Sequence, residues 1–168
     1  VDKPGEPLHR YPGFTSAIWQ CHPQSRGSIE IINPDPTADP KIQPNYLADD
    51  LDQKTMIEGI KILRKIYKQP KFQDLWDAEI IPGEQVRTDA EIIDAIRKGG
   101  GTVYHPVGTC KMGIDAAAVV GPDLLVHGVT GLRVVDASIM PLITSANTNA
   151  PTLMIAEKGA EMILASGN

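Results

Sequence analysis

Residues 145–164 read SANTNAPTLMIAEKGAEMIL, a polar loop that passes directly into a long, mainly apolar segment. Pro151 suits the first turn of a helix, because a proline there gives up an amide hydrogen that would have no partner in any case. The sequence therefore predicts a helix over residues 151–164. Since this helix is apolar on most of its surface, we expect it to be buried against another part of the protein or to drive self-association.

The polar loop places two asparagines, Asn147 and Asn149, directly ahead of this helix. The start of a helix carries unpaired N–H groups and the positive end of the helix dipole, which suit an anion or a polarised carbonyl group. An asparagine in this place is more commonly a helix cap. On the residues alone, both interpretations remain open.

Upstream of the loop lies the run LRVVDA, residues 132–137. Its apolar part predicts a short buried strand over residues 132–135. Asp136 would then stand at the end of this strand, with Ala137 after it. A carboxylate in such a place serves either a ligand or only a turn.

His105 lies in the run GGGTVYHPVGTCKMG, residues 99–113. The glycines before it and Pro106 and Gly108 after it predict an irregular turn. A histidine held in a rigid turn suits acid-base catalysis, because imidazole gains and loses its proton near neutral pH. A histidine hydrogen-bonded for structural reasons alone is the competing interpretation. We expect no functional role for the remaining histidines, which are His9, His22 and His127.

Two more helices are predicted in the middle of the chain. Apolar residues recur at helical spacing over residues 52–67, and Pro70 ends the pattern. Thr88 and Glu91 are spaced as in a capping box, so a second helix begins there and runs to the glycines at 99–101. We expect both helices to be scaffold rather than site.

The N-terminal part predicts a small amount of sheet. Residues 15–21 and 27–32 are β-prone runs separated by a turn, which favours two adjacent strands. Residues 33–47 contain four prolines and should form an ordered extended loop, because each proline removes a backbone donor and fixes φ. Residues 1–13 are interpreted as a surface arm or as the trailing end of a longer chain.

Composition narrows the class of protein. The 168 residues are 42% hydrophobic and 22% charged, which is enough for a globular core. A net charge of −5 without a basic cluster argues against nucleic acid as a partner. Cys21 and Cys110 form no CxxC pair, so we expect free thiols, no metal site and a cytoplasmic location. No apolar run reaches the roughly 18 residues of a membrane span, and we expect none.

The chain contains none of the motifs GxGxxG, GxxxxGKS/T, HExxH or GxSxG. A more specific signal comes from four blocks in order: HPQSRGSIEI (22–31), YHPVGTCKMG (104–113), GVTGLRVVDASIMP (128–141) and SANTNAPTLMIAEKGAEMI (145–163). Together they resemble the C-terminal region of the glucose-methanol-choline oxidoreductases over nearly the whole chain.

This resemblance implies an α+β fold, in which an antiparallel sheet with flanking helices forms the substrate-binding domain. It assigns residues 1–113 to that domain. Residues 114–168 would be a return segment whose strand and helix complete the FAD-binding domain. The N-terminal dinucleotide-binding half of the family is absent from the chain, so we expect that half as its partner and expect weak or no FAD binding without it.

The resemblance also implies the chemistry, which is FAD-dependent oxidation of a small-molecule primary alcohol to an aldehyde. His105 would accept the hydroxyl proton while a hydride leaves for flavin N5, and Asn147 would hydrogen-bond the alcohol oxygen. The residues implied to lie against FAD are Asp136 and Ala137 near the ribityl-pyrophosphate, with the backbone around Thr148 and Asn149 at the flavin C2 carbonyl.

Two alternatives to alcohol oxidation are considered. A few members of the family use the same fold for cyanohydrin cleavage or decarboxylation, although His105 together with Asn147 favours oxidation. The isolated chain could also be an inactive scaffold or interaction module without FAD. Flavin absorbance of the chain, alone and beside its N-terminal half, separates these cases.

Overall fold

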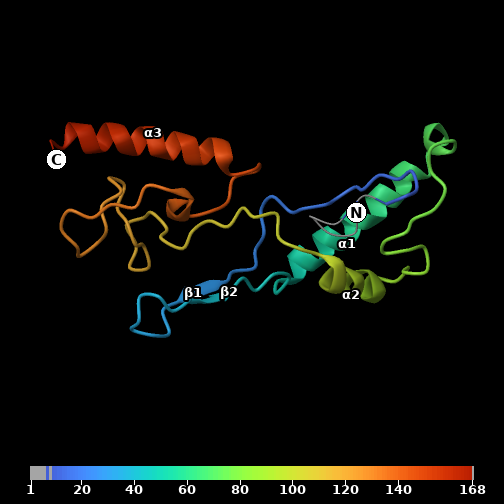
Figure 1. The fold of residues 1–168 in the computed structure, drawn as a ribbon, viewed down its shortest axis with the longest axis horizontal. Coiled ribbons are helices and arrows are strands. Elements are labelled where there is room, and N and C mark those ends of the chain that lie inside the picture. Colours follow the sequence, from blue (N-terminus) through green and yellow to red (C-terminus); the bar gives the residue numbers. More distant parts are fainter. Residues whose placement is uncertain (1–6, 8, 168) are drawn as a thin grey trace.

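The computed structural model describes residues 7 and 9–167. The chain is elongated, with helices α1 (Asp50–Tyr67) and α2 (Asp89–Gly99) at one end and α3 (Asn149–Ala165) at the other (Figure 1). A connecting segment, yellow in Figure 1, leads from α2 to the loops beside α3. This architecture of helices with a small antiparallel sheet is consistent with the expected α+β class.

Helix α1 begins two residues before the predicted start at residue 52. Its N-cap is Asp49, whose side chain accepts a hydrogen bond of 2.8 Å from the backbone N–H of Leu51. Acidic residues in the first turn and basic residues in the last turn complement the helix dipole. The helix ends at Tyr67, as predicted, ahead of a short 3-10 turn at Pro70–Phe72.

Helix α2 confirms the predicted capping box. The backbone N–H of Glu91 donates to Thr88 Oγ1 at 3.3 Å, and the backbone N–H of Thr88 donates to Glu91 Oε2 at 2.8 Å. Two of the helix's otherwise unpaired donors are thereby satisfied. Helices α1 and α2 pack together through a hydrophobic cluster, called here the helix-pair cluster, formed by Ile57, Ile92 and Ile93 with Leu47, Ile60, Val86 and Ile96 around them.

The sheet differs from the expected pairing. It contains two antiparallel strands, β1 (Ser28–Glu30) and β2 (Lys41–Gln43), with Ile29 opposite Ile42. The first lies inside the predicted strand 27–32, but its partner comes from the proline-rich stretch that was predicted to be loop throughout. Prolines stand just outside β2, at 40 and 44, so the residues between them keep the backbone N–H groups that pairing requires.

Residues 15–21 are not a strand, so this prediction is wrong. The segment runs extended along α1, where the Ile18 side chain lies close against the backbone of Gly59. Just before it, the rings of Phe14 and Tyr67 are 5.3 Å apart. Ile18 is thus partly covered by a helix, and the backbone of this segment forms no ladder with another strand within the described residues.

The strand predicted over residues 132–135 is also absent. Only an isolated antiparallel bridge joins Arg133 to Leu125. Leu125 and Arg133 both lie close to turns. The next residue, Val126, forms a bridge with Val120, and its backbone N–H donates to the Leu132 carbonyl at 2.9 Å. A ladder therefore does not extend beyond single pairs here.

Helix α3 starts two residues before the predicted position, so that Pro151 lies in its first turn, as expected. Ile155 and Gly159 are buried where the helix meets the preceding loops. A Cβ added to Gly159 would lie 2.2 Å from Val135 Cγ1, so only glycine permits this close approach. The packing forms a second cluster, called here the α3 cluster, of Val120, Leu124, Ile139, Met140 and Ile155.

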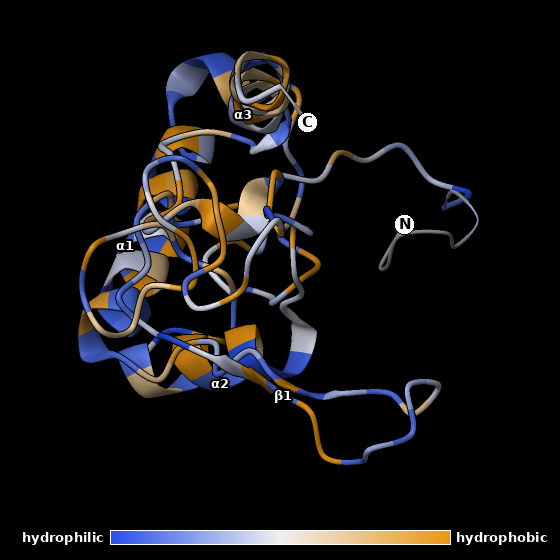
Figure 2. Cartoon of the chain, turned by 90° about the vertical axis from the view of Figure 1, so that its left-hand side faces the viewer, coloured by the Kyte–Doolittle hydropathy of each residue, from blue (hydrophilic) through white to orange (hydrophobic). Residues whose placement is uncertain are grey.

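Much of the rest of α3 is exposed. Leu153, Met154 and Leu164 are 60%, 61% and 81% exposed. Figure 2, in which α3 is seen nearly along its axis, shows apolar residues beside polar ones around the helix. The expectation that this helix is buried is therefore met on one side only, and self-association stays a prediction. Across residues 7 and 9–167, no helix is long and apolar enough to cross a membrane.

Candidate functional site

His105 and Thr148 form the centre of the candidate site. His105 Nδ1 lies 2.9 Å from Thr148 Oγ1 and 3.4 Å from the backbone nitrogen of Thr148. Thr148 is 7% exposed, and the imidazole is half-buried. Among the described residues, the recorded hydrogen bonds of the ring are all at Nδ1. The structure thus brings two of the predicted site residues together across 43 positions of sequence.

The backbone around His105 is held in an irregular turn, as the sequence predicts. Tyr104, just before it, has a φ of +60°, and Gly108, just after it, has a φ of +86°. Gly108 passes so close to the chain that an added Cβ would lie 3.2 Å from the Met140 carbonyl oxygen. A positive φ and this close approach both favour glycine.

Backbone hydrogen bonds dock the His105 segment onto the segment that precedes α3. The N–H of Cys110 donates to the Ser138 carbonyl at 3.0 Å, and the N–H of Met112 donates to the Ile139 carbonyl at 2.7 Å. Met112 also packs against the α3 cluster. His105 is therefore placed by the same packing that positions α3.

Thr148 is the N-cap of α3, but its hydroxyl makes no capping hydrogen bond. Instead, the hydroxyl faces His105, while the Thr148 carbonyl accepts from the backbone N–H of Thr152 at 3.0 Å and from Thr152 Oγ1 at 2.6 Å. The N–H groups of Asn149 and Ala150 have no acceptor within the helix, because they belong to its first turn. The start of α3 thus offers two backbone donors beside the imidazole.

Asn147 directly precedes Thr148 and is exposed. Its neighbour Ser145 is held by His22, whose Nε2 lies 2.6 Å from Ser145 Oγ. His22 was expected to have no role, and the sequence holds no signal for this contact, since the residues stand 123 positions apart. The loop that carries Asn147 is therefore anchored from the N-terminal part of the chain.

Asp136 is the N-cap of a short 3-10 helix, η2 (Ala137–Ile139). Its carboxylate accepts from the backbone N–H of Ser138 at 2.7 Å and from the Ser138 hydroxyl. Ala137 is half-buried and packs against the α3 cluster. Of the two interpretations of Asp136, the turn is what these contacts describe, and a place beside FAD stays a prediction for both residues.

The remaining histidines lie apart from this arrangement. His127 is exposed, and its Nε2 lies 3.2 Å from the Gly113 carbonyl oxygen. The His9 ring stacks on Tyr11 with centroids 4.7 Å apart. Both cysteines are free, and no group of residues within 7 and 9–167 is arranged to hold a metal ion.

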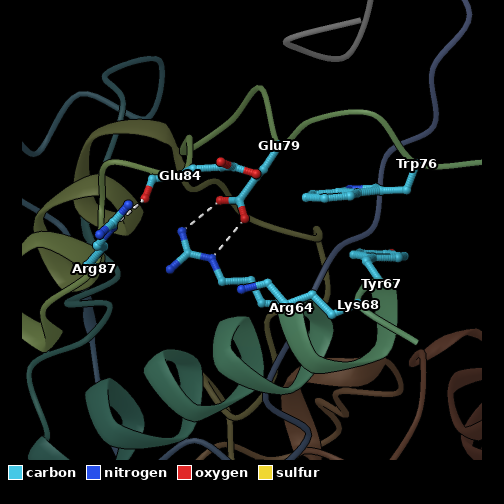
Figure 3. Close-up of a pocket in the computed structure, with 7 residues that line it drawn as sticks. All are labelled: Arg64, Tyr67, Lys68, Trp76, Glu79, Glu84 and Arg87. Carbon is cyan, nitrogen blue, oxygen red and sulfur yellow. Dashed lines mark hydrogen bonds and ion pairs between the residues drawn. The ribbon is translucent and has the colours of Figure 1, made fainter. Parts of the chain in front are cut away.

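A cavity of about 470 Å³ lies at the C-terminal end of α1, away from His105. Figure 3 shows that its polar side chains face one another: Arg64 donates to both Glu79 carboxylate oxygens, at 2.8 and 2.7 Å. This pairing with Glu79 raises the pKa of Arg64. Arg64 also donates to the Val86 carbonyl at 2.7 Å, so its contacts join α1 to the segment before α2. Because these charged side chains are paired with one another, we interpret the cavity as part of the scaffold rather than as a site. The cavity is lined by Arg64, Tyr67, Lys68, Trp76, Glu79, Glu84 and Arg87.

Comparison with known proteins adds independent evidence. A family model described as GMC oxidoreductase matches residues 23–156. An alcohol dehydrogenase (acceptor) of Pseudomonas putida is 52% identical over 152 residues, which are 90% of this chain and 28% of the relative. An oxygen-dependent choline dehydrogenase of Chromohalobacter salexigens is 45% identical over 153 residues, 90% of this chain and 27% of the relative.

Among solved structures, an FAD-dependent oxidoreductase from Chaetomium thermophilum superposes with a TM-score of 0.81 at 29% sequence identity. The match covers 88% of this chain and 26% of that one. The chain therefore spans little more than a quarter of the length of the proteins that it matches. Because the family model covers most of the chain, the resemblance seen in the sequence is confirmed, and the chain belongs to the GMC oxidoreductase family, whose C-terminal domain it carries.

Proposed function

We propose that this chain is the catalytic C-terminal part of an FAD-dependent oxidoreductase that oxidises a primary alcohol to an aldehyde. The observation that carries the proposal is the half-buried imidazole of His105, fixed through Nδ1 at 2.9 Å from Thr148 Oγ1 at the start of α3. Such an arrangement leaves Nε2 to take part in proton transfer. The alcohol dehydrogenase of Pseudomonas putida, 52% identical to the chain, supports the substrate class.

The residues at the start of α3 fit a flavin. The N–H groups of Asn149 and Ala150, unpaired within the helix, suit a carbonyl oxygen that gains negative charge, as the flavin C2 carbonyl does on reduction. FAD, when bound, supplies the acceptor for the hydride that leaves the alcohol carbon. Asp136 and Ala137, which lie in the segment packed beside α3, are proposed to approach the ribityl-pyrophosphate part.

His105 and Asn147 would divide the handling of the alcohol oxygen. His105 takes the hydroxyl proton at Nε2, which makes departure of the hydride easier, a contribution typically of about 100- to 10,000-fold. The Asn147 side-chain amide, exposed in the loop before Thr148, donates a hydrogen bond to the same oxygen as charge develops there. An amide donor does this without competing for the proton.

The rest of the site would come from an N-terminal FAD-binding half. This chain covers only 28% and 27% of the length of the two relatives, so most of their length lies outside the matched region. We assign residues 1–113 to the substrate-binding domain and residues 114–168 to a segment that completes the FAD-binding domain. The exposed apolar side chains of α3, which include Leu153 and Met154, would then lie against that half.

The proposal is tested in the enzyme that joins this chain to its FAD-binding half. Anaerobic stopped-flow mixing with a panel of primary alcohols should bleach the oxidised flavin absorbance with at least one of them. His105→Ala should slow this reduction by on the order of 100-fold or more while FAD stays bound. Flavin reduction at the wild-type rate in that variant would show that His105 is not the base.

A further inference from the structure

Two atoms of Thr148 lie within hydrogen-bonding distance of Nδ1 of His105. The hydroxyl, whose oxygen lies 2.9 Å from Nδ1, can accept a hydrogen bond from the ring or donate one to it. The backbone N–H, 3.4 Å from the same Nδ1, can only donate. In a neutral imidazole one nitrogen carries the proton and the other carries the lone pair, so these contacts decide which nitrogen can act as a base.

We propose that the Thr148 hydroxyl accepts a hydrogen bond from Nδ1–H of His105 and thereby keeps the lone pair on Nε2. The inference rests on the proposed function, since it concerns the tautomer of the proposed base. Thr148 is then a positioning residue that acts through His105. In the enzyme, Thr148 determines which ring nitrogen of His105 carries the lone pair that takes the alcohol proton.

Of the two partners of Nδ1, only the Thr148 hydroxyl can accept from Nδ1–H, the form that a base acting through Nε2 requires. The contact to the hydroxyl oxygen is 0.5 Å shorter than the contact to the backbone nitrogen (3.4 against 2.9 Å), and 3.4 Å is long for a hydrogen bond from an N–H group. Thr148 is 7% exposed, so water does not readily replace the hydroxyl as the partner of Nδ1. The hydroxyl also makes no helix-capping bond, which leaves it for the ring.

The same contact suits the step that follows. When Nε2 takes the hydroxyl proton, both ring nitrogens carry hydrogen, and the Thr148 oxygen accepts from Nδ1–H before and after the transfer. The backbone N–H would instead face a hydrogen in the protonated ring. Without the hydroxyl, only that N–H remains at Nδ1, and it favours the other tautomer, in which Nε2 already holds its proton.

The test compares Thr148→Val, which keeps the shape but removes the acceptor, with Thr148→Ser, which keeps the hydroxyl. Both are measured in the complete enzyme with bound FAD. In ¹⁵N-histidine-labelled enzyme we expect Nε2 of His105 to be of the lone-pair type in wild type and Thr148→Ser, and of the N–H type in Thr148→Val. Resonances are assigned by their loss in His105→Gln.

Flavin reduction provides the second measurement. Thr148→Val should lower its rate by on the order of 10- to 100-fold, and Thr148→Ser should restore it to within about threefold of wild type. Thr109→Val, at an exposed threonine in the His105 segment, serves as the matched control and should change neither readout.

The wild-type tautomer alone decides the proposal even if Thr148→Val fails to fold. A lone pair on Nδ1 of wild-type His105 overturns it, and so does an unchanged tautomer in a folded Thr148→Val enzyme. A failure of the proposed function looks different. In that case His105→Ala reduces flavin at the wild-type rate, whereas the Thr148-dependent tautomer is still seen in the spectra.

Discussion

His22 and Ser145 lie 123 positions apart, yet His22 Nε2 and Ser145 Oγ are 2.6 Å from each other. The contact ties the segment before β1 to the loop that carries Asn147. A loop with few internal hydrogen bonds gains order from such an external anchor. We therefore expect the contact to affect how the Asn147 amide is placed.

Ser145→Ala removes this anchor while leaving the loop sequence otherwise intact. In the complete enzyme we expect the rate of flavin reduction to fall a few-fold, because Asn147 is less often in position, with FAD still bound. Ser28→Ala is the control, since the Ser28 hydroxyl bonds Glu30 on its own strand and not the Asn147 loop. Equal rates in Ser145→Ala and wild type would contradict a role for the anchor.

Asn147→Ala tests the second proposed catalytic group. We expect a loss of about 1–3 kcal/mol of transition-state stabilisation, because one hydrogen bond to the developing alkoxide is removed and the proton acceptor stays. His127→Ala should change the rate little, since the His127 ring bonds the Gly113 carbonyl, at 3.2 Å, and not the His105 site. Stopped-flow reduction should rank the losses as His105→Ala, then Asn147→Ala, then His127→Ala. Any other order would argue against the roles assigned here.

Asp52 gives a pH-dependent prediction for stability. Burial, with 2% exposure, raises the pKa of this carboxyl, but the backbone N–H groups of Gln24 and Ser25, at 2.8 and 2.7 Å, outweigh it and hold the pKa below its ordinary value. A pKa lowered by folding stabilises the protein above the unfolded pKa of about 3.9, and this contribution is lost as the pH falls through the folded value.

Asp52→Asn should therefore lower the free energy of unfolding by about 1–3 kcal/mol at pH 7. The difference from wild type should shrink below about pH 4, where the wild-type carboxyl also takes up a proton. Urea unfolding at several pH values measures both. Asp50→Asn is the control, because Asp50 is an exposed neighbour in the first turn of α1. A similar pH-dependent loss of stability in that variant would show that the buried contacts of Asp52 are not its cause.

Gly159→Ala probes the close approach of α3 to the loops. The added methyl group would lie 2.2 Å from Val135 Cγ1, so the helix or the Val135 side chain must shift, and we expect a loss of about 1–3 kcal/mol in unfolding free energy. Gly99→Ala provides a matched helical glycine, in α2, with no atom within 4 Å of the added carbon. Thermal unfolding should separate the two variants, and equal midpoints would mean that α3 does not pack as described.

The helices could be predicted because their signals are local. Thr88 and Glu91 specify the start of α2 within one turn, and Pro151 marks the start of α3 to within two residues. Of the strands, only β1 was predicted, within residues 27–32, and its partner was not, because pairing depends on a segment elsewhere in the chain. Residues 15–21 have β-prone composition, but Ile18 packs against α1 instead of a strand, whereas β2 lies between two prolines.

The candidate site, too, could be predicted only in part from the sequence. His105 could be singled out from the sequence because the surrounding glycines and proline predict its turn. The family resemblance then implied that it is the base. The contact with the Thr148 hydroxyl could not be foreseen, since Thr148 was expected to contribute its backbone. Nor could His22, whose partner is set by the path of the whole chain.

The two hydrophobic clusters have a consequence for how the chain opens. Ile92, in the helix-pair cluster, and Val120, in the α3 cluster, are both fully buried, but they lie in separate cores at opposite ends of an elongated molecule. Amide hydrogens near Ile92 and near Val120 should then exchange with solvent through separate local openings. A ligand bound at the start of α3 would slow amide exchange around Val120. It would leave the free energy of local opening of the helix pair unchanged.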